Sequence, residues 1–360
     1  MASSLINTAN NPAWQEWMTS LMGEVSGGAV SRQTYAATLP PDRFYCLLDE
    51  LPLHLIPQRF VKTLQLQEDR SQVLCLNPDC ILCAHGQLPD ELAPSKDGFS
   101  RFALQGTMAW VRNPATGSLL PFWLGPQLEG VLQGLRPNEP VPPSVPDSAS
   151  RLLAAVDILV PIDCTSRDRQ REEARAEMIG KASPRFREKG YAPLGDLIHP
   201  FHIAALRRYY RYLIRSGAIR LGDGQSARRY VAYNEPVARF FHREIAATLS
   251  AVAGEALKPS YVYMASYLSG AELKKHTDRE QCEFSVTLCL DFSPEPALAT
   301  PWPIQLDTPT GTVTVYQALG DGLAYRGTRL PHYRRPLSEG QTSTSIFFHY
   351  VGADFAGSLD

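Results

Sequence analysis

The sequence predicts an α+β protein in which a β-sandwich or barrel with supporting helices follows a mixed α/β region. Short apolar runs separated by turn residues succeed one another after residue 258, at the regular spacing of strands in a sandwich or barrel. Two amphipathic helical patterns, over residues 200–216 and 234–253, come just before them. Residues 35–135 alternate short apolar runs with turns, which indicates the mixed α/β arrangement.

The composition of the 360 residues is that of a globular protein, with 44% hydrophobic and 20% charged residues. Basic residues number 35 and acidic ones 37, and the resulting net charge of -2 favours neither a nucleic acid nor an anionic membrane as partner. Seven cysteines, an odd number, argue against a disulfide framework. No apolar run approaches the roughly 20 residues of a spanning helix. We expect a reduced, soluble, cytoplasmic protein that binds a small molecule or a peptide.

Residues 136–148 contain five prolines and mark the expected domain boundary, with a long surface loop as the alternative. The chain is expected to divide into an N-terminal accessory region, 1–148, and a second domain, 149–360. A short amphipathic helix carrying Trp14 and Trp17 is expected near the start. Because the first region exceeds what a barrel needs, we expect it to recognise a larger substrate or to mediate homodimerisation.

The helices expected before the strands have recognisable ends. Gly217 is a natural C-terminal stop for the helix over 200–216. For the next helix, Asn234 suits the N-cap and Pro236 the first turn, and Gly254 follows the last helical residue. The charged residues 166–182 predict one more, exposed helix. The predicted strands cover residues 261–268, 283–292, 302–306, 312–316, 322–325 and 344–351.

The tripeptide His276-Thr277-Asp278 is the sharpest chemical feature of the sequence. On a strand, residues i and i+2 point to the same side, so the imidazole and the carboxylate converge on one point. His332, 56 residues further along, is the candidate third ligand because it follows a predicted strand and a short loop. Two histidines and one carboxylate form the facial triad of non-haem iron oxygenases, which leaves coordination sites open. An exposed His–Asp pair beside a loop histidine is the alternative interpretation.

The stretch from Tyr267 to Asp278, Tyr-Leu-Ser-Gly-Ala-Glu-Leu-Lys-Lys-His-Thr-Asp, resembles the strand–turn–strand entry of prolyl-4-hydroxylase-like Fe(II)/2-oxoglutarate dioxygenases. Gly320-Asp-Gly-Leu-Ala-Tyr, followed by His332, resembles that family's approach to its distal histidine. The resemblance covers residues 200–352 and implies a double-stranded β-helix, or jelly-roll, barrel that binds Fe(II) through His276, Asp278 and His332. It also implies 2-oxoglutarate as co-substrate, with release of succinate and CO2, and ascorbate as a further candidate requirement.

The sequence departs from that family at the residue that pairs with the far carboxylate of 2-oxoglutarate. Thr342 stands where the family has Arg or Lys, and Thr344 can offer only a hydroxyl. The charge must then come from elsewhere, and Arg334 is favoured over Arg326, Arg329 and Arg335 because it shares the strand parity of His332. Tyr267 matches a family tyrosine near the co-substrate and could donate a hydroxyl.

A carboxylate at Asp278 favours hydroxylation, or a related desaturation or ring closure, over halogenation, because halogenating relatives have a small residue there. The predicted activity is therefore that of an oxidoreductase, a hydroxylase of an amino-acid, peptide or small-metabolite substrate. A different class of protein stays open: a non-catalytic, metal-binding jelly-roll scaffold with an N-terminal partner-binding module, which the missing basic residue at Thr342 motivates.

A second cluster, Cys75, Cys80, Cys83 and His85, carries four zinc-type donors within eleven residues. A second well-spaced pair is missing, so structural thiols are the preferred interpretation. His349 alternates with aromatic residues near the end of the last strand and is interpreted as a packing residue.

Overall fold

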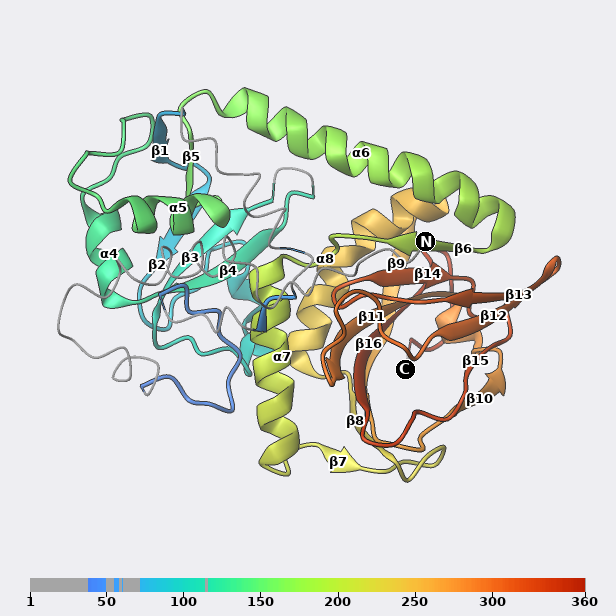
Figure 1. The fold of residues 1–360 in the computed structure, drawn as a ribbon. Helices are drawn as coiled ribbons and strands as arrows, with labels where there is room; N and C mark the ends of the chain where they lie inside the picture. Colours follow the sequence, from blue (N-terminus) through green and yellow to red (C-terminus); the bar gives the residue numbers. More distant parts are fainter. Residues whose placement is uncertain (1–37, 50–54, 58–59, 61–71, 114–115, 360) are drawn as a thin grey trace, which may run out of the picture. The chain divides into compact units, whose positions relative to one another are not determined.

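The computed structural model describes residues 38–49, 55–57, 60, 72–113 and 116–359, apart from the side chains of 164–171 (Figure 1). The helix expected around Trp14 and Trp17 lies outside the described residues. The chain forms two compact units, Met1–Lys96 with Phe102–Arg171, and Asp97–Arg101 with Glu172–Asp360. The division falls inside helix α6 (Cys164–Lys189), later than the proline-rich stretch in which the sequence placed it.

The first unit is mixed α/β. Its described strands and helices are β1 (Leu74–Leu76), β2 (Cys80–Cys83), β3 (Thr107–Arg112), β4 (Leu119–Leu124), α4 (Pro126–Gln133), α5 (Asp147–Ala155) and β5 (Leu159–Pro161). Strands β2, β3 and β4 form an antiparallel sheet, and β1 pairs with β5. The core is aromatic: the ring of Phe44 packs edge-on against those of Phe102 and Trp123, at centroid distances of 5.3 and 5.8 Å.

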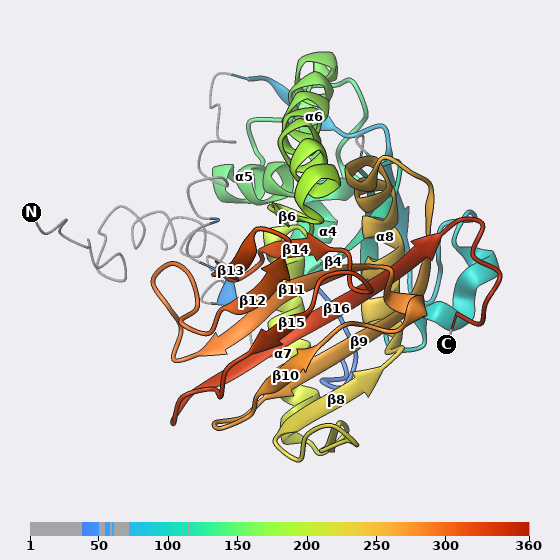
Figure 2. The ribbon, with the colours of Figure 1, turned by 90° about the vertical axis from the view of Figure 1, so that its right-hand side faces the viewer.

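The second unit contains two antiparallel sheets. The larger sheet has seven strands in the order β6-β14-β11-β16-β9-β8-β7, and the smaller one has four in the order β10-β15-β12-β13. From β9 onward, the chain passes back and forth between the sheets, and Figure 2 shows β16, β9 and β8 side by side. The strands are β6 (Tyr191–Leu194), β7 (Arg220–Leu221), β8 (Arg229–Tyr233), β9 (Leu257–Tyr267), β10 (Leu273–His276), β11 (Phe284–Ser293), β12 (Ile304–Thr308), β13 (Gly311–Val315), β14 (Gly322–Tyr325), β15 (His332–Arg334) and β16 (Thr342–Gly352).

The two sheets pack face to face through a shared apolar core. One buried cluster joins Leu306 of the smaller sheet to Leu323 and Tyr325 of the larger one. A second cluster packs Trp302 against Tyr267 and Phe347. Each predicted strand is present, so the expectation of antiparallel sheets with supporting helices is confirmed.

Helices α7 (Pro200–Arg215) and α8 (Pro236–Ala253) cover the outer face of the larger sheet (Figure 1). The predicted N-cap of α8 is wrong by one residue: the carboxylate of Glu235 accepts the N–H groups of Val237 and Ala238 at 3.1 and 3.0 Å. Asn234 instead has a left-handed backbone, φ 48°, and its side-chain oxygen accepts the N–H of Val262 on β9. The Asn234 side chain therefore accepts a hydrogen bond from the sheet and does not cap the helix.

A buried ion cluster ties α7 to β11. Arg207, which is fully buried, donates to Asp291 from Nε at 3.0 Å and to Glu295 from Nη2 at 2.6 Å. Arg211, one turn later, reaches the same Asp291 carboxylate at 2.5 and 2.8 Å. These two arginines of the helix therefore serve as structural contacts to the sheet.

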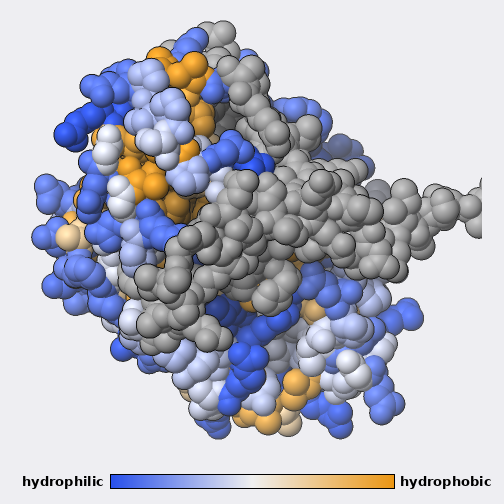
Figure 3. Space-filling model, turned by 60° about the vertical axis from the view of Figure 1, so that its left-hand side comes forward, coloured by the Kyte–Doolittle hydropathy of each residue, from blue (hydrophilic) through white to orange (hydrophobic). Residues whose placement is uncertain are grey.

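On the face shown in Figure 3, hydrophilic residues dominate the described surface and apolar residues gather in a few areas. Large apolar side chains that stay exposed among the described residues include Val73, Leu82 and Ile162 in the first unit. No helix in the described part of the chain is long and apolar enough to cross a membrane.

Candidate metal centre

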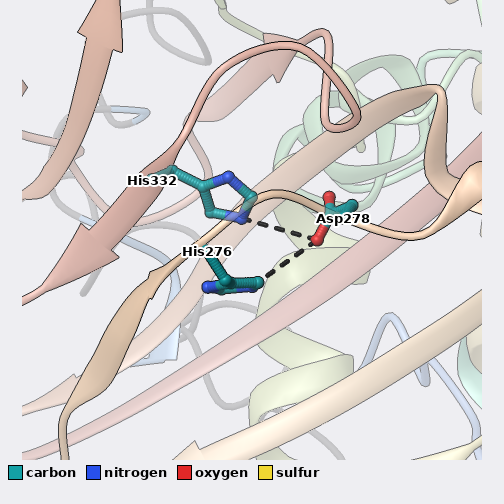
Figure 4. A group of neighbouring side chains, drawn as sticks. All are labelled: His276, Asp278 and His332. Atoms are coloured by element: carbon teal, nitrogen blue, oxygen red, sulfur yellow. Dashed lines mark ion pairs between the residues drawn. The ribbon is translucent and has the colours of Figure 1, made fainter.

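The two histidines meet because β10 and β15 pair antiparallel with His276 directly opposite His332. Their ring centroids are 4.4 Å apart. Asp278 lies just beyond the end of β10, where its N–H donates to the carbonyl of Gly327 at 2.9 Å. Its Oδ1 lies 3.6 Å from His276 Nε2 and 3.5 Å from His332 Nε2 (Figure 4). All three donor atoms lie within 4.8 Å of one another.

Backbone hydrogen bonds fix which nitrogen of each ring faces the carboxylate. His276 Nδ1 donates to the carbonyl of Lys274 at 2.7 Å, and His332 Nδ1 donates to the carbonyl of Leu330 at 3.0 Å. A carbonyl only accepts, so in the neutral rings the proton sits on Nδ1 and the lone pair on Nε2. Both lone pairs are therefore directed at Asp278. Metal-ligating histidines are oriented in the same way, by a hydrogen bond from the ring nitrogen that does not bind the metal.

The pKa values of the three groups follow from their surroundings. The interaction with the Asp278 carboxylate raises the pKa of His276, whereas burial lowers the pKa of His332 below its ordinary value. Burial alone would raise the pKa of Asp278, but the hydrogen bond from His276 and the charge of His332 bring it below the usual range. Burial thus favours the neutral form of His332, and the two histidines favour the anionic form of Asp278, which are the forms that bind a cation.

Three further residues support Asp278, and the sequence indicated none of them. Ser285 donates from Oγ to Asp278 Oδ2 at 3.1 Å and contacts His349 Nδ1 at 2.9 Å. A Cβ on Gly327 would collide with Asp278 Oδ2 and lie 2.9 Å from Ser285 Oγ, so only glycine fits there. His349 is buried beside the site, and burial lowers its pKa to about 4. The one available signal was that His349 lies two residues after Phe347, so both share one face of the last strand.

The site opens into a cavity of about 1170 Å³. The cavity is lined by all three candidate ligands together with Tyr267. Arg229 of β8 also lines it, although the sequence did not indicate this residue. Its Nη1 donates to the Tyr267 hydroxyl at 3.4 Å, and its Nη2 reaches Asp223 Oδ2 at 2.5 Å.

Arg334 is buried at 5% exposure behind the cavity and does not line it. Its guanidinium stacks 4.7 Å from the ring of Trp302 and donates to the Trp302 carbonyl at 2.5 Å and to Gln317 Oε1 at 3.1 Å. Within the described residues it forms no ion pair with a carboxylate, and burial lowers its pKa. The Trp302 ring in turn contacts Tyr267 at a centroid distance of 5.0 Å.

The two threonines proposed for the co-substrate lie elsewhere. Neither Thr342 nor Thr344 lines the cavity, and Thr344 donates its hydroxyl to Ser266 Oγ at 2.8 Å. The reason is that side chains alternate between the two faces of a strand. Phe347 and His349 of β16 line the cavity, so the even-numbered positions of β16 face the helices. These two predicted contacts are corrected accordingly.

The cysteine cluster is not assembled as a metal site. The described residues contain two groups of donors close enough to hold one ion, and both include Asp278. Cys80 and Cys83 are three positions apart on β2 and so point to opposite faces of its sheet, and His85 Nδ1 is hydrogen-bonded to the Gln105 carbonyl. Structural thiols, the preferred interpretation, fit this geometry.

No family model and no curated protein matches the chain. Solved structures do align with about half of it. The α-ketoglutarate-dependent epimerase SnoN from nogalamycin biosynthesis shares 15% identity over 49% of this chain and 83% of its own, with a TM-score of 0.41. A prolyl-4-hydroxylase from Pseudomonas putida shares 15% identity over 48% of this chain and 98% of its own, with a TM-score of 0.40. A Trichoplax adhaerens prolyl hydroxylase, solved with a hypoxia-inducible-factor peptide, shares 11% identity over 49% of this chain and 91% of its own, with a TM-score of 0.41.

SnoN has also been solved with Fe3+, α-ketoglutarate and nogalamycin RO. An oxidoreductase of the 2OG-Fe(II) oxygenase family from Burkholderia pseudomallei shares 14% identity over 49% of this chain and 92% of its own, with a TM-score of 0.39. At such identities, the reaction and substrate of this chain must be argued from its own residues.

Proposed function

We propose that this protein is an Fe(II)/2-oxoglutarate-dependent oxygenase that hydroxylates an unactivated C–H bond, with the sheets of its second unit forming a jelly-roll barrel. One observation carries the proposal: two imidazole Nε2 lone pairs and a carboxylate oxygen converge within 4.8 Å at the wall of a large cavity. Two histidines and a carboxylate on one side of an ion are the ligand set of non-haem iron oxygenases.

The residues present fit such an ion. His276 and His332 would bind through Nε2, because their Nδ1 atoms are engaged by carbonyl groups, and Asp278 would bind through Oδ1. Ser285 keeps the second carboxylate oxygen in place. When bound, iron with 2-oxoglutarate supplies the activation of oxygen, with succinate and CO2 released. The cavity leaves room beside the three ligands for the co-substrate and for part of a substrate.

Arg334 is proposed to pair with the far carboxylate of 2-oxoglutarate. A buried guanidinium that meets only neutral acceptors is costly, and an anion would compensate its charge. Because Arg334 does not line the cavity, the co-substrate reaches it past Tyr267, whose ring would have to shift. Arg229 is the rival. It lines the cavity, but Asp223 already compensates its charge.

The second candidate function is a non-catalytic metal-binding scaffold, with the first unit as a partner-binding or dimerisation module. The absence of a basic residue at Thr342 favours it. The open cavity against the three ligands supports the enzyme instead, because a scaffold has no need to keep a ligand-accessible face at its metal.

The two functions separate in one anaerobic experiment. Fe(II) is titrated into the metal-free protein by calorimetry, 2-oxoglutarate is then added, and succinate is measured by NMR after oxygen is admitted. The oxygenase binds one Fe(II), binds 2-oxoglutarate only afterwards and releases succinate slowly without substrate. Ascorbate in a parallel sample tests whether it is needed for repeated turnover.

The variants Asp278→Ala and His276→Ala should lose Fe(II) binding by at least about 100-fold. Asp307→Asn, which removes a partly exposed carboxylate paired with Lys275, is the matched control and should bind Fe(II) as wild type does. Fe(II) binding without 2-oxoglutarate binding would favour the scaffold. Undiminished Fe(II) binding by Asp278→Ala would rule out the centre altogether.

A further inference from the structure

Arg279, the residue that follows Asp278, lies on the cavity wall with two tyrosines. Its guanidinium carbon sits 4.4 Å from the ring centroid of Tyr261. Its Nε and Nη2 donate to the hydroxyls of Tyr261 and Tyr233, both at 3.3 Å. The two tyrosine rings lie 5.0 Å apart at an interplanar angle of 31°. A flexible side chain is thus held in one place at the metal centre.

The partners of this guanidinium are neutral. A guanidinium has five N–H donors, and the two tyrosine hydroxyls take one each. No carboxylate among the described residues forms an ion pair with Arg279. Arg279 is itself exposed, and Tyr233 is 47% exposed, so both can be reached from the cavity they line. Oriented donors remain available there for an anion.

The charges around the cavity add to this effect. Arg229 is compensated by Asp223. Arg228, which donates to the Ser269 carbonyl, adds a further positive charge with no described carboxylate partner. Lys274 of β10 lies on the same wall. Excluding the proposed metal ligand Asp278, four basic lining residues face two acidic ones, in a chain whose net charge is -2. A cleft with this bias concentrates anions at its mouth.

We propose that the substrate is an acidic small molecule whose carboxylate is bound by Arg279, while an aromatic or other flat apolar part packs against Tyr233. This inference rests on the proposed oxygenase function and names its substrate class. A planar guanidinium suits a carboxylate because both can form two parallel hydrogen bonds. The cavity, at about 1170 Å³, holds 2-oxoglutarate and a molecule of ordinary metabolite size.

The test uses matched pairs of acids and amides: indole-3-acetate with indole-3-acetamide, and 2-naphthoate with 2-naphthamide. Binding is measured by saturation-transfer NMR on the full chain loaded with Zn(II) and saturated with 2-oxoglutarate, so that the acids cannot occupy the co-substrate site. The wild type should bind each acid at least roughly 10-fold more tightly than its amide. Arg279→Gln should abolish that preference, Arg279→Lys should restore part of it, and Arg279→Glu should reverse it.

Arg185→Gln is the matched control, because Arg185 stacks on Tyr191 at 4.8 Å and donates to its hydroxyl at 3.0 Å away from the cavity. It should keep the preference for acids. Equal binding of acids and amides by the wild type, or an unchanged preference in Arg279→Gln, overturns the inference. Titrations of Fe(II) and 2-oxoglutarate into the same proteins separate this failure from failure of the proposed function, since Arg279→Gln should bind both as wild type does.

Discussion

Replacing Arg334 by methionine should separate the binding of 2-oxoglutarate from the stability of the fold. Methionine has a similar length and no charge, so it can fill the space beside Trp302. Arg334 is buried and meets the carbonyl of Trp302 and the amide oxygen of Gln317. The substitution therefore removes a buried charge together with two hydrogen bonds and a cation–π contact.

For stability, these losses and gains nearly cancel. Two hydrogen bonds from a charged donor contribute about 1.5–3 kcal/mol each, and the contact with the Trp302 ring contributes about 1–2 kcal/mol. Removing the desolvation cost of an uncompensated buried ion returns several kcal/mol. We expect the free energy of unfolding to change by no more than about 2 kcal/mol, which corresponds to a shift in Tm of about 4–8 °C for a unit of this size.

For 2-oxoglutarate, nothing offsets the loss. Removing one partner of a buried charge pair costs about 2–5 kcal/mol, so the Kd should rise by roughly 30- to 5000-fold. Calorimetric titration of 2-oxoglutarate into the Mn(II)-loaded protein gives the Kd, and thermal unfolding of the same sample gives the stability. Mn(II) affinity should stay close to that of the wild type.

Arg229→Met is the informative comparison. Burial raises the pKa of Asp223, but hydrogen bonds from Arg229 and Tyr263 outweigh it and lower this pKa to about 2. The substitution leaves the Asp223 carboxylate without its ion-pair partner. Arg229→Met should therefore destabilise the fold more than Arg334→Met while weakening 2-oxoglutarate less. If Arg334→Met binds 2-oxoglutarate normally and Arg229→Met does not, the co-substrate charge belongs to Arg229 and the reasoning from buried uncompensated charge is refuted.

Three further outcomes follow from the geometry. Gly327→Ala should lower Fe(II) affinity by about 10- to 100-fold in a calorimetric titration with little loss of helical circular dichroism, because its Cβ would displace the Asp278 carboxylate. Arg207→Ala should lower the free energy of unfolding by about 1–3 kcal/mol in urea, because it removes the buried hydrogen bonds to Asp291 and Glu295 while Arg211 still pairs with Asp291. Burial lowers the pKa of His242 to about 3, so this group stabilises the fold fully above pH 6.5 and progressively less as the pH falls toward 3. His242 alone should contribute a drop of about 2 kcal/mol in the free energy of unfolding from pH 7 to pH 5, and His242→Gln should reduce the slope accordingly.

The strands and helices that the sequence predicted are those with a strong local signal. Residues 322–325 are a continuous apolar run and form β14 with the predicted bounds, and residues 200–216 match α7 to within one residue. Strand β8, Arg229–Tyr233, was missed because two arginines precede a mixture of polar and apolar residues. Its place in the sheet comes from pairing with β9, and such pairing is not visible in a local pattern.

The same distinction holds at the site. The spacing of His276 and Asp278 is local, so the sequence could bring these two side chains together. Thr344 was misplaced because the face it occupies depends on the register of β16 against β9. Ser285 contacts Asp278 from β11, and Gly327 lies against it from the loop after β14, so these neighbours depend on the tertiary fold and no local pattern could have identified them.

Arg334 shows how the departure at Thr342 can be reconciled with the site. The cavity side of β16 next to Tyr267 carries Ser343, directly opposite that tyrosine in the pairing, so β16 offers no charge there, and the charge of Arg229 on β8, on the other side of β9, is compensated by Asp223. Arg334 approaches from the smaller sheet, and the Trp302 ring contacts both its guanidinium and the Tyr267 ring. Arg334 on the smaller sheet can bind the far carboxylate of 2-oxoglutarate only if the rings of Trp302 and Tyr267 move aside. The aromatic contact between Tyr267 and Trp302 would then control access to the co-substrate site.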